Sequence, residues 1–240
     1  MEIIGALIAS LIAGLSTLLG VVITYVKPKN YQRFITINLA FAMGVMALIS
    51  IKELIPISVK EIYRMYKLSN ACLIWLICPL FCLILLGLTE SKTKNNNSLK
   101  RVGVLSAIML FIHNIPEGIA TFISTLANSN IGIKITLAIM AHNIPEGIAI
   151  AVPIYYATKR RSQAIKYTLI SGMAEPVGGL LCYLLFKPYL NEKLLCVILY
   201  FVGTLMLIMA CLEILPEVMK AKRLDWLMIG VILSLAILIV

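Results

Sequence analysis

Eight long apolar runs, separated by short polar turns, constrain this chain more than any other feature of its sequence. Each run is close to the roughly 20 residues that a helix needs to cross a bilayer. Charged residues make up 13% of the chain, about half of the roughly 25% usual in soluble domains. The sequence therefore predicts an all-α polytopic membrane protein, a single domain over residues 1–240. Its predicted spans are 3–26, 34–57, 70–88, 102–127, 131–156, 163–186, 194–215 and 224–240.

The basic residues are divided unequally between the two ends of these predicted helices. Most lie at the turns that follow the odd-numbered runs, including the polar loop at about 90–101. Because basic residues favour the cytoplasmic side of a membrane, we expect these turns in the cytoplasm and both termini outside the cell membrane. The formal net charge of +10 is then suited to anionic lipid headgroups, and nucleic acid is not an expected partner.

One octapeptide, HNIPEGIA, occurs twice inside the apolar runs. The copies are 113–120 and 142–149, and they contain the only two histidines of the chain. Residues of a helix advance by about 100° each, so Glu117 projects between the directions of His113 and Asn114. Polar residues at membrane depth are costly and are usually functional. The repeat therefore predicts a polar site on the fourth and fifth spans.

Two such faces, brought together on antiparallel helices, offer two adjacent pockets. One pocket has two imidazoles and two carboxylates, and the other has two amides and the same carboxylates. Bridging glutamates would join the pockets into a binuclear metal site. The predicted ligands are His113, Asn114, Glu117, His142, Asn143 and Glu146.

The ligand chemistry of this site favours divalent metals that are bound and then released. Imidazole with carboxylate suits zinc and other first-row divalent ions. Amide and carboxylate oxygens suit harder or more loosely held ions. Pro116 and Pro145 each remove a backbone hydrogen bond, which frees a carbonyl oxygen toward the pathway. The zinc-protease pattern H-E-x-x-H is absent from the sequence.

A few other polar or soft residues in the apolar runs are weaker candidates. Glu175, before Pro176 in the sixth run, is expected to be a further ligand beside a broken helix. Met46 could supply a thioether ligand, although methionine in an apolar helix usually serves packing. Glu53 and Glu213, near helix ends, either attract cations to the pore mouths or mark the membrane interface.

A second, longer repeat relates the second run to the seventh. Residues 41–56 align with residues 201–216, with the phenylalanine, the methionine and the final Glu-x-x-Pro in matching places. These two spans run in opposite directions. The pattern therefore predicts an inverted-topology repeat of spans 1–3 and 6–8 around a central pair, spans 4 and 5.

The two H-N-x-P-E-G motifs and the arrangement of runs resemble the ZIP family of divalent metal (zinc/iron) transporters, in its bacterial-type branch. The resemblance implies import of Zn²⁺, together with Fe²⁺, Mn²⁺ or Cd²⁺, by alternating access of spans 1, 4, 5 and 6 against the others. It also implies a homodimer and no cofactor beyond the transported ion. His113, Glu117, His142 and Glu146, with Met46, would form the transport site. The second site would comprise Asn114, Glu117, Asn143, Glu146 and Glu175.

Two other functions compete with transport at this stage. A membrane-embedded metallohydrolase would use one open-coordinate metal and a general base, which a duplicated symmetric site does not favour. A metal sensor would bind ions without moving them. The loop at 90–101 holds no histidine, so metal sensing by that loop is not expected. We therefore expect a transporter and not an enzyme.

Overall fold

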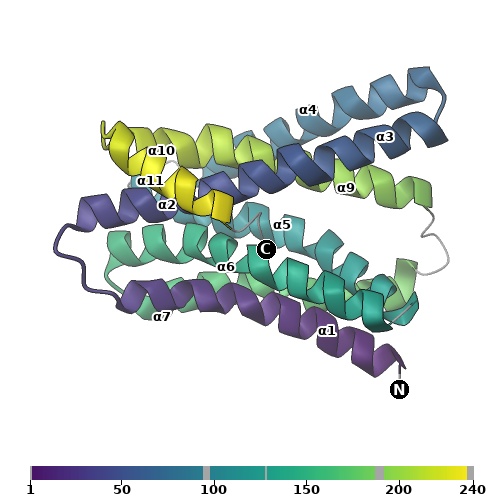
Figure 1. Cartoon of the computed structure of the whole chain (residues 1–240), viewed down its shortest axis with the longest axis horizontal. Coiled ribbons are helices and arrows are strands. Elements are labelled where there is room, and N and C mark those ends of the chain that lie inside the picture. Colours follow the sequence, from purple (N-terminus) through teal and green to yellow (C-terminus); the bar gives the residue numbers. More distant parts are fainter. Residues whose placement is uncertain (1, 94–97, 128, 187–191, 237–240) are drawn as a thin grey trace.

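The computed structural model describes residues 2–93, 98–127, 129–186 and 192–236, and within these ranges the chain is helical apart from short turns (Figure 1). In the part of the chain that the structure describes, six helical stretches are long and apolar enough to cross a membrane by length and composition. This confirms the prediction of an all-α polytopic membrane protein. The stretches are Ile3–Tyr25, Tyr31–Met65, Leu68–Thr89, Ser98–Leu126, Gly132–Thr158 and Cys196–Met219.

The other two predicted spans do not form long helices in the described residues. The run at 163–186 is divided into α7 (Arg161–Gly172), α8 (Ala174–Leu181) and the π-helical η3 (Cys182–Phe186). Pro176 lies in the first turn of α8, where a missing N–H has no helical partner to lose. The last run forms α11 (Leu224–Leu235), and residues 237–240 lie outside the described residues. The count of eight spans therefore stays a prediction.

The second and seventh runs both continue through a proline by way of a π-helical turn. α2 (Tyr31–Ile49), η2 (Ser50–Leu54) and α3 (Ile55–Met65) are continuous. The connector expected after residue 57 is therefore helical up to Met65. α9 (Glu192–Met209), η4 (Ala210–Ile214) and α10 (Leu215–Met219) repeat the arrangement. A local π adjustment lets a helix accept a proline such as Pro56 or Pro216 without breaking.

The remaining elements are α1 (Glu2–Ser16), the 3-10 helix η1 (Thr17–Tyr25), α4 (Leu68–Thr93), α5 (Ser98–Ala127) and α6 (Ser129–Thr158). The polar loop expected at 90–101 is helical on both sides, and its residues 94–97 lie outside the described residues. α5 and α6 each run unbroken through the proline of their octapeptide.

The helices fall into two groups that also contact each other, chiefly through α2 against α6. The site group consists of α1, η1, α5, α6, α7, α8 and η3, and the support group consists of α2, η2, α3, α4, α9, η4, α10 and α11. In Figure 1, the support-group helices α2, α3, α9, α10 and α11 lie along one side of the molecule and α1, α6 and α7 along the other. A hydrophobic core that includes Met46, Leu110, Ile150 and Met206 joins the two groups.

Close backbone approach within the site group depends on glycine. A Cβ at Gly118 would collide with the backbone of Glu175, and a Cβ at Gly147 would collide with the carbonyl oxygen of Thr17. Small residues of this kind let membrane helices approach closely. The same is seen inside the support group, where Gly230 lies against Ala40. These glycine contacts bind helices of one group to each other, while larger apolar side chains fill the boundary between groups.

Candidate metal site

The antiparallel pair α5 and α6 brings the two octapeptides face to face in the interior. His113 Nε2 lies 3.1 Å from Glu117 Oε1 of its own helix and 3.3 Å from Glu146 Oε1 of the other. His142 Nε2 lies 2.9 Å from Glu117 Oε1. Glu117 therefore contacts both imidazoles, in agreement with the helical geometry expected from the four-residue spacing.

These side chains are withdrawn from solvent to different degrees. The side chains of His113 and Glu146 are each 1% exposed, whereas that of His142 is 14% exposed. Charged or polar groups at such depth are normally paired or bind a metal. Here the Oε2 atoms of Glu117 and Glu146 have no hydrogen-bond partner among the described residues. The site therefore holds spare oxygen ligands as well as imidazole nitrogen.

Three of these residues can reach one cation. One ligand atom each from His113, Glu117 and Glu146 lies within 4.8 Å of the others. Nitrogen and carboxylate ligands in a compact cluster are the donor set that zinc accepts in proteins. His142 is tied to this cluster through Glu117. Residues from both predicted motifs thus meet in one place.

The asparagines of the two motifs each donate hydrogen bonds in the interior, and their role as metal ligands stays a prediction. Asn143 donates from Nδ2 to Glu175 Oε1 and, at 2.9 Å, to the carbonyl oxygen of Ala13. Asn114 donates to the carbonyl oxygen of Ser171 at 3.2 Å. No hydrogen bond between either asparagine and Glu117 or Glu146 is formed within the described residues. Instead, each amide is oriented by the backbone of α1 or α7.

That orientation leaves acceptor atoms available in the interior. The Oδ1 atoms of Asn114 and Asn143 and the Oε2 atom of Glu175 are buried, and no described residue forms a hydrogen bond with them. Such atoms are costly in a membrane protein unless an ion or water satisfies them. The backbone contacts of Ala13 and Ser171 were not predicted from sequence. The sequence feature that could have indicated these contacts is the glycine next to each residue, in Ala13-Gly14 and Ser171-Gly172, because small residues mark close helix contacts.

Glu175 is positioned by the break between α7 and α8. It stands in the first turn of α8, and its backbone lies against Gly118 of α5. Because no side chain separates the two helices there, the carboxylate lies deep enough to accept from Asn143. The end of α7 at Gly172 and the start of α8 at Ala174 confirm its expected place beside a helix break, while its role as a ligand stays a prediction.

The remaining candidates stand on α2, η2 and η4 of the support group. Met46 is fully buried in the core that joins the groups, and its role as a ligand stays a prediction. Glu53 is exposed in η2. Glu213 is buried in η4, and its Oε1 lies 3.6 Å from Nε of Arg101. The two glutamates of the longer repeat therefore have different environments.

A cavity of about 360 Å³ leads to the cluster from one end of the molecule. Glu117 and His142 lie on its wall, and the rest is mainly apolar. The cavity follows the C-terminal half of α5 and the N-terminal half of α6, where α9 and η2 face them. At the opposite end of α5, Val102, Leu105 and Leu110 are buried. The cluster is therefore reached from one end and covered at the other.

Comparison with known proteins agrees with this arrangement. The family model described as "ZIP Zinc transporter" matches residues 88–239. The zinc transporter ZupT of Chlorobium phaeovibrioides is 38% identical over 230 residues, covering 88% of this chain and 86% of the relative. ZupT of Oceanobacillus iheyensis is 36% identical over 258 residues, covering 98% and 96%. ZupT of Campylobacter jejuni is 32% identical over 277 residues, covering 99% and 95%.

The family match, together with the helical membrane fold that holds the buried His/Glu cluster, defines a membrane transporter rather than an enzyme. The chain belongs to the ZIP zinc transporter family, in its bacterial-type branch. The family resemblance predicted from the two octapeptides is thereby confirmed.

Proposed function

We propose that this protein imports Zn²⁺ into the cytoplasm through a binuclear site between α5 and α6. The observation that carries the proposal is the convergence of His113, Glu117 and Glu146 on one point, which a cavity reaches through Glu117 and His142. Its similarity to proteins named zinc transporters supports zinc as the cargo. Because affinities of nitrogen and oxygen sites overlap among divalent metals, Fe²⁺, Mn²⁺ and Cd²⁺ are further proposed cargo.

The proposed transport site comprises His113, Glu117, His142 and Glu146, with Met46 as an added thioether ligand. The proposed second site comprises Asn114, Asn143 and Glu175 together with the two motif glutamates. The support for this second site is the set of buried oxygen atoms that have no hydrogen-bond partner among the described residues. Burial of unpaired oxygen atoms is costly, and a bound cation would offset that cost. Glutamate oxygens that bridge the two sites would let an ion pass from one to the other.

The proposed architecture is one domain of eight transmembrane helices with an inverted repeat. Both the sequence and the structure support the inverted repeat. π-helical turns occur at Ser50–Leu54 and Ala210–Ile214, which are 160 residues apart in matching copies of the repeat. In each copy the turn directly precedes a Leu/Ile-Pro step. Two unrelated apolar helices would not be expected to share so uncommon a local structure.

Alternating access is the proposed transport cycle, with the site group moving against the support group. The glycine contacts that lie inside each group support this division, because close backbone contact makes each group move as a unit. In the conformation described here the cavity lies toward the end where α5 finishes and α6 begins. That end is extracytoplasmic in the proposed orientation, so this conformation would accept ions from outside.

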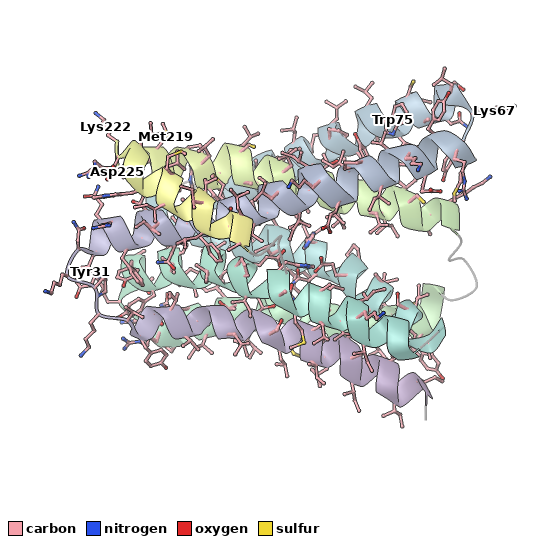
Figure 2. All side chains as sticks on the ribbon, in the orientation of Figure 1. Tyr31, Lys67, Trp75, Met219, Lys222 and Asp225 are labelled. Atoms are coloured by element: carbon pink, nitrogen blue, oxygen red, sulfur yellow. The ribbon has the colours of Figure 1, made fainter. Side chains whose placement is uncertain are left out.

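The proposed orientation follows the charges at the two ends. Tyr31, Met219, Lys222 and Asp225 lie at one end of the molecule, and Lys67 lies at the other (Figure 2). The first end carries more of the basic turns and would be cytoplasmic in the cell membrane, with both chain termini outside. The exposed apolar face of α4, which includes Leu76, Leu80 and Ile84, would contact lipid or a second copy in a homodimer.

Uptake of radioactive zinc into proteoliposomes tests the proposal. The unmodified protein is expected to give saturable uptake, and the His142→Ala/Glu146→Ala variant is expected to fall to background because it loses ligands from α6. A Glu61→Ala/Tyr63→Ala variant, altered on α3 away from the site, serves as the matched control. Stoichiometric zinc binding without flux, in sealed vesicles of known orientation, would refute transport and favour a sensor.

The second site has its own expected result. An Asn143→Ala/Glu175→Gln variant should lower bound zinc from about two ions per chain to about one, because the oxygen ligands of that pocket are lost. Equilibrium dialysis with metal analysis of the purified protein measures this stoichiometry. An unchanged stoichiometry in a variant that elutes as a single folded species would argue against a binuclear site.

A further inference from the structure

The boundary between the two groups differs in character at its two ends. At the cavity end, apolar residues of α5 and α6 face apolar residues of α9 across open space; these are Ile123, Ile135, Ile139, Ile198, Leu199 and Val202. At the opposite end, polar side chains cross the boundary. Arg101 of α5 lies 3.6 Å from Glu213 of η4, and Ser98 donates to Glu217 of α10 at 3.3 Å.

The Arg101–Glu213 pair is largely shielded from solvent. The side chain of Glu213 is 3% exposed and that of Arg101 is 30% exposed. Exposed ion pairs contribute little, but removal of one partner from a buried pair is costly because a buried charge is left uncompensated. The pair therefore favours the arrangement in which α5 and η4 stay together.

A crevice lies beside the Ser98–Glu217 contact at this end. It has a volume of about 260 Å³, and Leu99, Glu217 and Lys220 lie on its wall together with Gln32 and Leu39 of α2. Separation of α5 from η4 and α10 would enlarge this crevice toward the interior. The polar contacts thus lie where a second opening to the site would form.

The equivalent glutamate at the cavity end makes no such contact. Glu53 occupies the position of Glu213 in the longer repeat, is exposed, and forms no ion pair within the described residues. Its neighbour Leu54 lines the open cavity. Of the two glutamates related by the repeat, Glu213 therefore bridges the groups and Glu53 does not, as far as the described residues extend.

We propose that the Arg101–Glu213 pair holds the site group and the support group together at the cytoplasmic end, and that it must separate before zinc can leave. This inference rests on the proposed alternating-access function. It assigns Arg101 and Glu213 as positioning residues, which set the fraction of protein molecules whose cavity is open to the outside. Neither residue needs to touch the ion.

Thiol labelling measures the fraction of molecules whose cavity is open to the outside. The six native cysteines are replaced by alanine, and Ile135→Cys places one thiol on the cavity wall. A membrane-impermeant maleimide is then applied from outside in the presence of a chelator. Arg101→Gln and Glu213→Gln are each expected to slow labelling about fivefold or more, since a coupling of this kind changes populations by that order. The double variant should be no slower than the single variants.

The matched control is another ion pair at the same end of the molecule. Arg223 Nη2 lies 2.7 Å from Asp225 Oδ2, but both residues are at the start of α11 in the support group, Arg223 as its N-cap and Asp225 in its first turn. Arg223→Gln with Asp225→Asn should leave the labelling rate unchanged. An equal slowing in this control, or unchanged labelling in both Arg101→Gln and Glu213→Gln, would overturn the proposal.

A cross-link tests the same contact without altering Arg101 or Glu213. In the cysteine-free protein, Ser98→Cys with Glu217→Cys is oxidised to join α5 to α10. Zinc uptake is expected to stop and to return on reduction, while labelling at Ile135→Cys persists. Uptake that continues in fully cross-linked protein would overturn the proposal. Absence of uptake by the unmodified chain would instead refute the proposed function.

Discussion

Replacement of Glu117 by glutamine is expected to abolish zinc uptake. Glu117 Oε1 lies 3.1 Å from His113 and 2.9 Å from His142, so one carboxylate organises imidazoles from two helices. Glutamine keeps the shape but loses the charge that holds both the ion and these nitrogens. The lost charge-assisted contacts correspond to about 3 kcal/mol, or about a hundredfold in affinity.

Zinc titration of the purified variant, together with uptake in proteoliposomes, measures this loss. Glu53→Gln is the matched control, since it makes the same chemical change at an exposed glutamate of η2 and should leave affinity unchanged. His142→Ala should have a smaller effect than Glu117→Gln, because His142 is more exposed and its ion-pair contact in the cluster is to Glu117 alone. Near-normal affinity in Glu117→Gln would show that the cluster is not the zinc site.

Replacement of Gly118 by alanine is expected to give the largest loss of stability among simple glycine substitutions. The added Cβ would collide with the backbone of Glu175, and neither helix backbone can yield as a flexible side chain would. Overpacking of this kind costs about 3 kcal/mol or more when backbone must move. The shift would also displace Glu175 from Asn143, so zinc binding at the second site should fall with stability.

The thermal stability of the detergent-solubilised protein measures this effect. Gly87→Ala provides the control, because a Cβ at Gly87 meets nothing within 4 Å. That change should be neutral or stabilising by about 0.5–1 kcal/mol, since alanine is the better helix former. If Gly118→Ala were as stable as Gly87→Ala, the close packing of α5 on α8 would be wrong.

The contacts that could be predicted from sequence are those fixed by spacing along one helix. His113 and Glu117 are four residues apart, so their contact follows from the helical repeat alone, and the duplicated motif indicates that His142 and Glu146 belong to the same site. The contacts of the asparagines could not be obtained in this way. They depend on how closely α1 and α7 approach α5 and α6, which is decided by tertiary packing at residues such as Gly14 and Gly172.

The fold shows the same division between local and tertiary causes. The apolar runs predicted the long helices because length and hydropathy are properties of each segment. The continuation of α2 through Pro56 into α3 was not predicted, since proline usually favours a helix end. The π-helical turn at Ser50–Leu54 absorbs the proline, and a hydropathy pattern carries no information about that turn.

The helices that bear the proposed imidazole, amide and carboxylate ligands, α5, α6 and α8, all belong to the site group. If that group moves as a unit, the coordination sphere travels unchanged, and the ion would be held about equally strongly at either face of the membrane. Net flux would then follow the difference in free zinc concentration across the membrane, as in facilitated diffusion. Met46 is the exception, because it stands on α2, so its thioether would be the one proposed ligand able to make affinity differ between the two faces.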